Sequence, residues 1–182
     1  IKNFNLIMES VGYNKLDIVD NRLVKQNIFT KLDFNAIAKG YAVDLIAELL
    51  NNKLIDNYLI DIGGEIRVKG KNLQKNNFWT VAINDPNLDS QKQFYKVLQL
   101  YDKSIATSGN YRNFRIDSIT NRKYVHTLNP INGKSEQTDI LSASVIANSC
   151  FEADAFATDL MAGDFDNAKK LIEKNKQIDV YL

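Results

Sequence analysis

Residues 58–70 read YLIDIGGEIRVKG, and this stretch decides the expected fold. Its first five residues are mostly apolar and run into Gly63 and Gly64, a pair typical of a tight turn between two strands. The second half ends at Gly70. The pattern therefore predicts two short strands joined by a glycine turn.

A helix is predicted directly upstream of this hairpin. It begins near Ala36 and extends to about Lys53, because apolar residues recur every four positions and form one broad buried face. The residues that carry this period are Ile37, Tyr41, Leu45 and Leu49. Before this helix, a short helix over 4–11 and two short strands over 16–20 and 22–27 are expected.

Downstream, the chain reads as a series of strands followed by two helices. Trp79, Val81 and Ile83 alternate with polar or small residues, which is typical of a half-buried strand. The near-continuous apolar run over 140–147 predicts a strand buried on both faces. The remaining elements are strands over 96–102, 103–109, 110–116, 123–130 and 177–182, and helices over 151–162 and 165–175. We expect one α+β domain over residues 1–182, with a mixed or antiparallel sheet and packed helices.

Composition narrows the class of protein. The 182 residues are 45% apolar and 25% charged, as in an ordinary soluble globular domain. Lys plus Arg number 23 and Asp plus Glu 22, and this balance gives no reason to expect a nucleic-acid partner or an anionic membrane surface. There is no apolar run long enough for a transmembrane helix. The chain opens at Ile1 without a methionine, so we expect its beginning to be missing.

Four segments rich in turn-forming residues could present backbone amides to an anion, although each alone is also explained as a tight turn. They are residues 33–40, 61–67, 106–111 and 126–134. In the first segment, the start of the helix and Lys39, a mobile cation, could hold a phosphate. The alternative is that Asp33 caps the helix and Lys39 is solvated.

His126 is the only histidine, so it is the one side chain whose ordinary pKa suits proton transfer at neutral pH. A structural role is the alternative. Two nucleophiles could pair with it, Ser108 in a hydrolase triad with an Asp, or Cys150 in a thiol dyad. Neither lies on a recognisable nucleophile motif.

Asp154 and Thr158 lie four residues apart, on one face of the predicted helix. Their oxygens could bind Mg²⁺, which completes its octahedral coordination with waters and substrate phosphates. The alternative is an exposed Asp and a Thr that packs its methyl group. Small residues surround the pair and leave room for a ligand: Ala153, Ala155 and Ala157.

Six motifs, taken in order, resemble the ApbE family of FAD:protein FMN transferases. They are DFNAIAKGYAVD, YLIDIGGEIRVKG, WTVAINDP, SIATSGNYRNF, YVHTLNPINGK and SCFEADAFATDL, and the resemblance covers about residues 10–172. It implies an ApbE-like, T-fold-type α+β domain. It also implies a magnesium-dependent enzyme that transfers FMN from FAD to a Ser or Thr hydroxyl of an acceptor flavoprotein and releases AMP.

The resemblance also assigns site residues. Asp154, Thr158 and the backbone carbonyl of Ala36 are implied as metal ligands, and His126 and Asp154 as catalytic residues. The residues implied in binding FAD are Lys39, Asp44, Gly63, Gly64, Thr107, Ser108 and Gly109.

Partners and location follow from the resemblance alone. It implies an acceptor subunit of a membrane redox complex or a similar protein, and a lipoprotein on the periplasmic side of the bacterial inner membrane. The lipid anchor and an N-terminal part of the fold would lie outside this sequence. Two rival functions are a Mg²⁺-dependent FAD pyrophosphatase, in which water replaces the acceptor, and an FAD-binding module without turnover.

Overall fold

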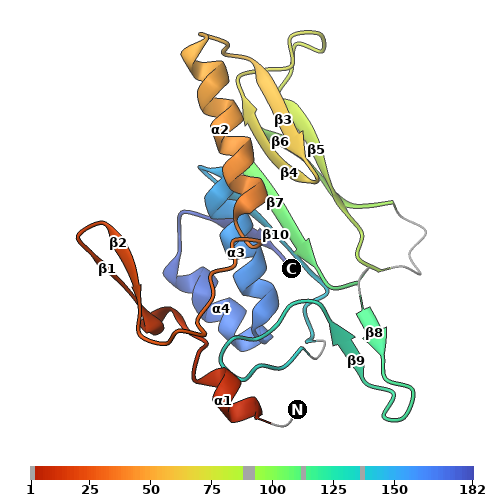
Figure 1. The fold of residues 1–182 in the computed structure, drawn as a ribbon. Coiled ribbons are helices and arrows are strands. Elements are labelled where there is room, and N and C mark those ends of the chain that lie inside the picture. Colours follow the sequence, from red (N-terminus) through yellow and green to blue (C-terminus); the bar gives the residue numbers. More distant parts are fainter. Residues whose placement is uncertain (1–2, 88–92, 112–113, 136–137) are drawn as a thin grey trace.

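The computed structural model describes residues 3–87, 93–111, 114–135 and 138–182 (Figure 1). Its centre is a five-stranded sheet in the order β11-β10-β7-β4-β3, with antiparallel pairing throughout. The strands are β3 (Tyr58–Ile62), β4 (Glu65–Lys69), β7 (Ser104–Gly109), β10 (Ser142–Ala147) and β11 (Asp179–Tyr181). The fold is α+β, as predicted, and the described part of this sheet is antiparallel rather than mixed.

Three helices cover one face of this sheet: α2 (Ala38–Asn52), α3 (Cys150–Ala162) and α4 (Phe165–Lys174). Buried alanines and Leu160 of α3 pack against β7 and β10, while Val43 and Ala47 of α2 pack against Tyr58 and Ile60 of β3. α3 therefore lies at the centre of the helical layer, between α2 and α4 (Figure 1).

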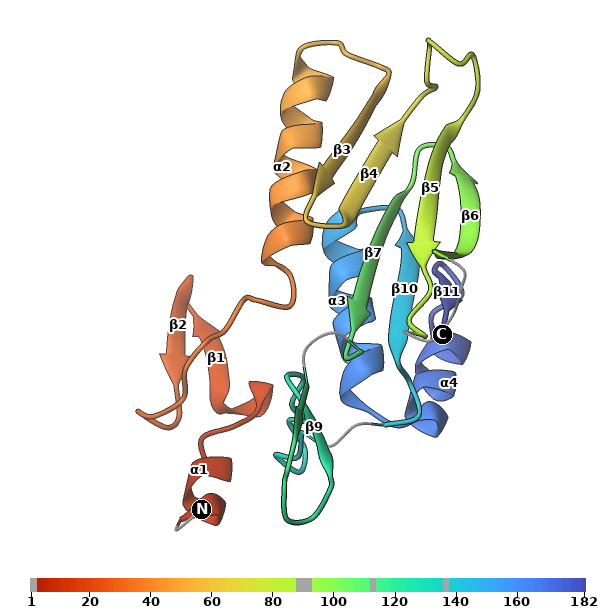
Figure 2. The same cartoon turned by 90° about the vertical axis from the view of Figure 1, so that its right-hand side faces the viewer.

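The opposite face is covered by an antiparallel ribbon of β5 (Trp79–Asn84) and β6 (Phe94–Leu100), as Figure 2 shows. Val81 and Ile83 are buried against Ile105 and Ile146, which confirms the alternation read from the sequence. Because both faces are covered, every residue of β10 is buried, as its apolar run predicts.

Two smaller ribbons project from this body (Figures 1 and 2). After α1 (Phe4–Met8) and a short 3₁₀ turn, β1 (Leu16–Val19) and β2 (Arg22–Lys25) form a hairpin. The second ribbon pairs β8 (Phe114–Ile116) with β9 (Lys123–Val125), so the strand predicted over 123–130 ends early. The strand predicted over 110–116 includes residues 112–113, which lie outside the described ranges.

The glycine turn between β3 and β4 is a two-residue hairpin, as predicted. Gly63 and Gly64 have backbone φ angles of 65° and 103°, values that residues with a Cβ rarely adopt. The Asp61 Oδ1 atom accepts a 2.9 Å hydrogen bond from the Gly64 amide. The turn places Glu65, the first residue of β4, on the face of the sheet that carries α2 and α3.

Candidate active site

The site begins where α2 crosses α3. The Gly40 amide donates a 2.9 Å hydrogen bond to Oδ2 of Asp154, which is buried. A Cβ at Gly40 would lie 2.3 Å from the Cys150 carbonyl oxygen and 2.8 Å from the Asp154 Cβ. Only glycine permits this approach, so Gly40 brings the start of α2 onto the Asp154 carboxylate.

This hydrogen bond changes what the Ala36 carbonyl can do. In an uninterrupted helix the Gly40 amide would donate to the carbonyl oxygen of Ala36, four residues earlier. Its hydrogen goes to Asp154 instead, and no other backbone donor to that oxygen is found within the described ranges. The Ala36 carbonyl, implied as a metal ligand by the resemblance, is therefore left as an available acceptor.

Thr158 lies one turn of α3 beyond Asp154, and its hydroxyl is 3.2 Å from the hydroxyl of Ser108 on β7. A carboxylate, a hydroxyl and a free carbonyl are all hard oxygen ligands, the class that Mg²⁺ prefers. Among the described residues no cluster of three or more His, Cys, Asp or Glu could hold a metal. The oxygen set around Asp154 fits Mg²⁺ bound partly by waters or phosphate.

Lys39, which the sequence offers either as a mobile cation for a phosphate or as a solvated residue, is ion-paired in the structure. Its ammonium lies 2.5 Å from Oε1 of Glu65, whose side chain is 2% exposed. Burial raises the pKa of Glu65, although the hydrogen bond and charge of Lys39 oppose that shift. Burial likewise raises the pKa of Asp154, while the Gly40 amide and then Lys39 lower it. One lysine thus faces two buried carboxylates.

Asp33 does not cap α2. Its Oδ1 atom accepts a hydrogen bond from the Asn35 amide at 2.8 Å, within the turn that precedes the helix. The amides of Ile37 and Ala38 both donate to the Phe34 carbonyl instead. The helix therefore starts two residues later than the predicted Ala36, and Lys39 occupies its first turn.

Asp44 serves the start of α3. Its two carboxylate oxygens accept hydrogen bonds from the Cys150 amide at 3.0 Å and the Phe151 amide at 2.8 Å, and it also pairs with Arg67. The Ser149 side chain accepts from the Glu152 amide and completes the cap. These partners give Asp44 a structural role that the sequence does not reveal, and a role in binding FAD stays a prediction.

The three residues at the end of β7 divide between the two faces of the sheet. Ser108 faces α3, whereas the Thr107 hydroxyl lies 2.7 Å from that of Ser144, on the face toward β5 and β6. Thr107 can therefore approach a ligand on the helical face only through its backbone. Gly109 ends the strand, and a Cβ there would lie 2.8 Å from the Tyr111 ring.

His126 directly follows β9, and its side chain is exposed. Its neighbour Thr127 donates a 3.0 Å hydrogen bond to Oδ1 of Asn110, which follows the end of β7. Thr127 also lines a hollow together with Met161 and Gly163, at the end of α3. The β7 end therefore links the two parts of the site, with Ser108 touching Thr158 and Asn110 touching the His126 segment.

Among the described residues, neither alternative nucleophile is paired with His126. Cys150 is fully buried, its Sγ lies 3.8 Å from the Ile66 carbonyl oxygen, and burial raises its pKa to about 12. A buried neutral thiol is a poor nucleophile. The Ser108 hydroxyl is paired with Thr158, and no hydrogen bond joins it to His126 within the described ranges.

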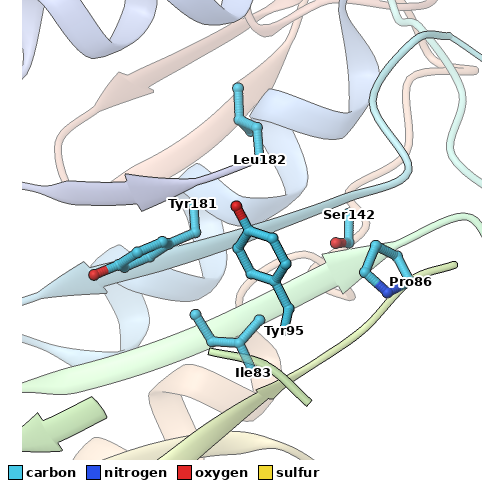
Figure 3. A pocket seen from close by; sticks show the side chains of 6 residues that line it. All are labelled: Ile83, Pro86, Tyr95, Ser142, Tyr181 and Leu182. Carbon is cyan, nitrogen blue, oxygen red and sulfur yellow. The ribbon is translucent and has the colours of Figure 1, made fainter. Parts of the chain in front are cut away.

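Figure 3 shows a separate hollow on the far face of the sheet, lined by residues of β5, β6, β10 and β11. Its volume of about 30 Å³ is enough for roughly one water molecule. Tyr95 and Tyr181 are its titratable residues. The hollow contains no charged side chain and is too small for a nucleotide.

Sequence reasoning missed Glu65, Gly40 and Arg67. Glu65 follows a glycine turn at the start of a strand, a place where a charged residue is ordinarily solvent-exposed. The signal that could have found it is the alternation within EIRVK, which sets Glu65 and Arg67 on the face opposite Ile66 and Val68.

The chain is similar to several enzymes named FAD:protein FMN transferase. It is 36% identical to that of Vibrio cholerae over 166 residues, covering 91% of this chain and 48% of the relative. It is 33% identical to the enzyme of Haemophilus influenzae, and the match covers 94% of this chain and 50% of that relative. The chain thus spans about half the length of the curated relatives it matches.

Solved structures agree with this relationship. The flavin transferase ApbE from Vibrio cholerae superposes with a TM-score of 0.84 at 34% identity, over 98% of this chain and 55% of that one. The apo form of the flavinyl transferase ApbE from Pseudomonas stutzeri superposes with a TM-score of 0.84 at 32% identity, over 98% of this chain and 53% of that one. The model of the ApbE family matches residues 2–182. The chain belongs to the ApbE family.

Proposed function

We propose that this chain forms the catalytic part of an FAD:protein FMN transferase. The observation that carries the proposal is the hydrogen bond between Gly40 and Asp154, which brings a buried carboxylate to the start of α2. Lys39 lies in the first turn of that helix, and the Ala36 carbonyl just before it has no backbone donor within the described ranges. A lysine, a helix start and hard oxygen ligands suit a pyrophosphate accompanied by a divalent cation.

Asp154, Thr158 and the Ala36 carbonyl would hold Mg²⁺. When bound there, the cation supplies positive charge that stabilises the pyrophosphate in the transition state. Lys39 adds a second positive charge at the start of α2, where the helix dipole also favours an anion. In phosphoryl transfer, positioning and charge neutralisation of this kind dominate catalysis.

The reaction joins the acceptor hydroxyl to the FMN-side phosphorus. The hydroxyl oxygen of a Ser or Thr attacks that phosphorus, the bond to the bridging oxygen breaks, and AMP leaves with that oxygen. His126 accepts the proton of the attacking hydroxyl. Its exposed position at the end of β9 suits contact with a second protein.

The acceptor and the location belong to the same proposal. We infer a flavoprotein subunit of a membrane redox complex or a similar protein as the acceptor, and the periplasmic side of the inner membrane as the location, reached through a lipid anchor. These inferences rest on the family resemblance. Of the helices in the described ranges, none is both long and apolar enough to cross a membrane.

Incubation of the protein with FAD, Mg²⁺ and a candidate acceptor, followed by mass spectrometry, tests the function. The expected result is FMN attached to a Ser or Thr of the acceptor, with one AMP released for each FMN attached. AMP release without any acceptor would indicate an FAD pyrophosphatase. FAD that is bound and stays intact with Mg²⁺ and acceptor present would indicate a binding module.

A further inference from the structure

Glu65 is a buried carboxylate that the proposed chemistry leaves unexplained. Its side chain is 2% exposed, whereas that of its partner Lys39 is 49% exposed. The Oε1 atom lies 2.5 Å from the ammonium, and the Oε2 atom has no hydrogen-bond partner among the described residues. The two partners of this ion pair therefore differ in solvation, because the carboxylate is buried and the ammonium is half-exposed.

Stability does not account for this arrangement. Burial of a carboxylate costs free energy that one ion pair seldom repays, and an unpaired buried oxygen adds to that cost. An apolar side chain of similar size would ordinarily stabilise such a position at least as well. A buried carboxylate that does not serve stability points to a role in the site.

The surroundings show what Glu65 does. Lys39 has a long flexible side chain, and its Cδ and the Glu65 Oε2 each lie 3.8 Å from the place where a Cβ of Gly63 would stand. Both groups therefore lie beside the glycine turn. The charge of Lys39 also acts on Asp154. The ion pair with Glu65 thus holds a lysine that lies beside the glycine turn and whose charge reaches the Asp154 carboxylate.

We propose that Glu65 is a positioning residue, whose buried carboxylate holds the Lys39 ammonium in the place where it meets the pyrophosphate of FAD. The inference rests on the proposed function. A positioning role and a simple charge effect predict opposite changes in FAD affinity. Removal of a negative charge near the site would by itself strengthen the binding of an anion. Loss of positioning weakens binding instead.

The test replaces Glu65 in the full chain and measures equilibrium binding of FAD and FMN with Mg²⁺ present. In Glu65→Met, which keeps the volume but cannot hold Lys39, the Kd for FAD should rise about tenfold, the loss of roughly one charge-assisted contact. FMN lacks the pyrophosphate and should lose less. Glu65→Gln retains an oxygen that can accept from Lys39, so its Kd should lie between those of Glu65→Met and the unchanged chain.

The thermal midpoint and a double variant separate positioning from a structural role. Glu65→Met should keep or raise the melting temperature, because the half-exposed Lys39 can turn into water and leaves no buried charge unpaired. Lys39→Met with Glu65→Met should bind FAD as weakly as Lys39→Met alone, because the two residues act as a unit. The matched control is Asp56→Asn, which removes a carboxylate that is 72% exposed and paired with Lys69, and should leave FAD binding unchanged.

Two results would overturn the inference about Glu65 without affecting the proposed function. In the first, Glu65→Met binds FAD as tightly as the unchanged chain or more tightly. In the second, the losses in FAD affinity of the two single variants add fully in the double variant. If Glu65→Met does not fold, the same comparison with Glu65→Gln decides, with equal or tighter binding again counting against the inference. No binding of FAD by the unchanged chain would instead overturn the proposed function, and this inference with it.

Discussion

The amide of Gly40 and the carboxylate of Asp154 are hydrogen-bonded at 2.9 Å although 114 residues separate them in the chain. The bond fixes the start of α2 against the second turn of α3. It orients the Asp154 carboxylate and frees the Ala36 carbonyl at the same time. One backbone contact thus joins the start of α2 to the buried carboxylate of the proposed metal site.

Gly40→Ala should destabilise the protein, although the same change in an exposed helix stabilises by about 1 kcal/mol. The new Cβ would lie 2.3 Å from the Cys150 carbonyl oxygen, so α2 must move away from α3. Overpacking of this kind costs about 1–3 kcal/mol. Urea unfolding measures the loss, with Gly163→Ala, whose Cβ would meet only Asn167 at 3.2 Å, as the control. Equal stability of the two variants would contradict the contact.

Asp154→Asn should abolish the response to Mg²⁺. With Mg²⁺ at about a hundredfold excess over its Kd, the unchanged chain should gain about 2.7 kcal/mol, or roughly 5–10 °C in melting temperature. The variant should gain nothing and lose Mg²⁺-dependent transfer, because an amide lacks the charge that a hard cation requires. Thr158→Ala should do less damage, since water can replace a hydroxyl. Full activity of Asp154→Asn at low millimolar Mg²⁺ would refute the assignment.

Local sequence patterns predicted most of the helices and strands. For the site they indicated which kinds of residue could take part, but not which contacts those residues make. The turn at Gly63 and the buried run over 140–147 follow from local chemistry, and both are confirmed. The link between Gly40 and Asp154 joins distant segments, and no periodicity reports such a contact. The burial of Glu65 is likewise set by the packing of α2 and α3 over β4, which the sequence of β4 alone does not specify.

Asp44→Ala should lower stability through α3. The change removes two hydrogen bonds to the first amides of that helix and leaves Arg67 without its carboxylate. One hydrogen bond to a charged group is worth about 1.5–3 kcal/mol, so with two such bonds removed denaturant unfolding should show a loss of at least this size. Asp164→Ala is the matched control, because Asp164 caps only α4 and should cost about 1 kcal/mol. A smaller loss for Asp44→Ala than for the control would show that the cap contributes little.

Cys150 should make stability fall at alkaline pH. Burial raises the pKa of its thiol from 9.0 to about 12, so the folded protein keeps a proton that the unfolded chain releases above pH 9. The contribution is therefore fully present below pH 9 and is lost as the pH rises toward 12. The melting temperature of the unchanged chain should fall more steeply between pH 9 and 11 than that of Cys150→Ala. Parallel curves would show that the thiol titrates normally in the folded state.

Thiol reagents provide an independent check on the same residue. Because Cys150 is fully buried, a disulfide reagent at pH 8 should label it only after the protein is unfolded in denaturant. Rapid labelling of the folded protein would place the thiol at the surface and reopen its pairing with His126.

His126→Asn should separate binding from chemistry. The imidazole lies on the exposed segment after β9, which contacts Asn110 through Thr127 and is distinct from the Gly40 and Asp154 contact. The variant should therefore bind FAD with an unchanged Kd and release AMP about 10²–10⁴-fold more slowly, the usual loss of general-base assistance. A weaker affinity for FAD with an unchanged kcat would make His126 a binding residue, and the base would then have to be a carboxylate.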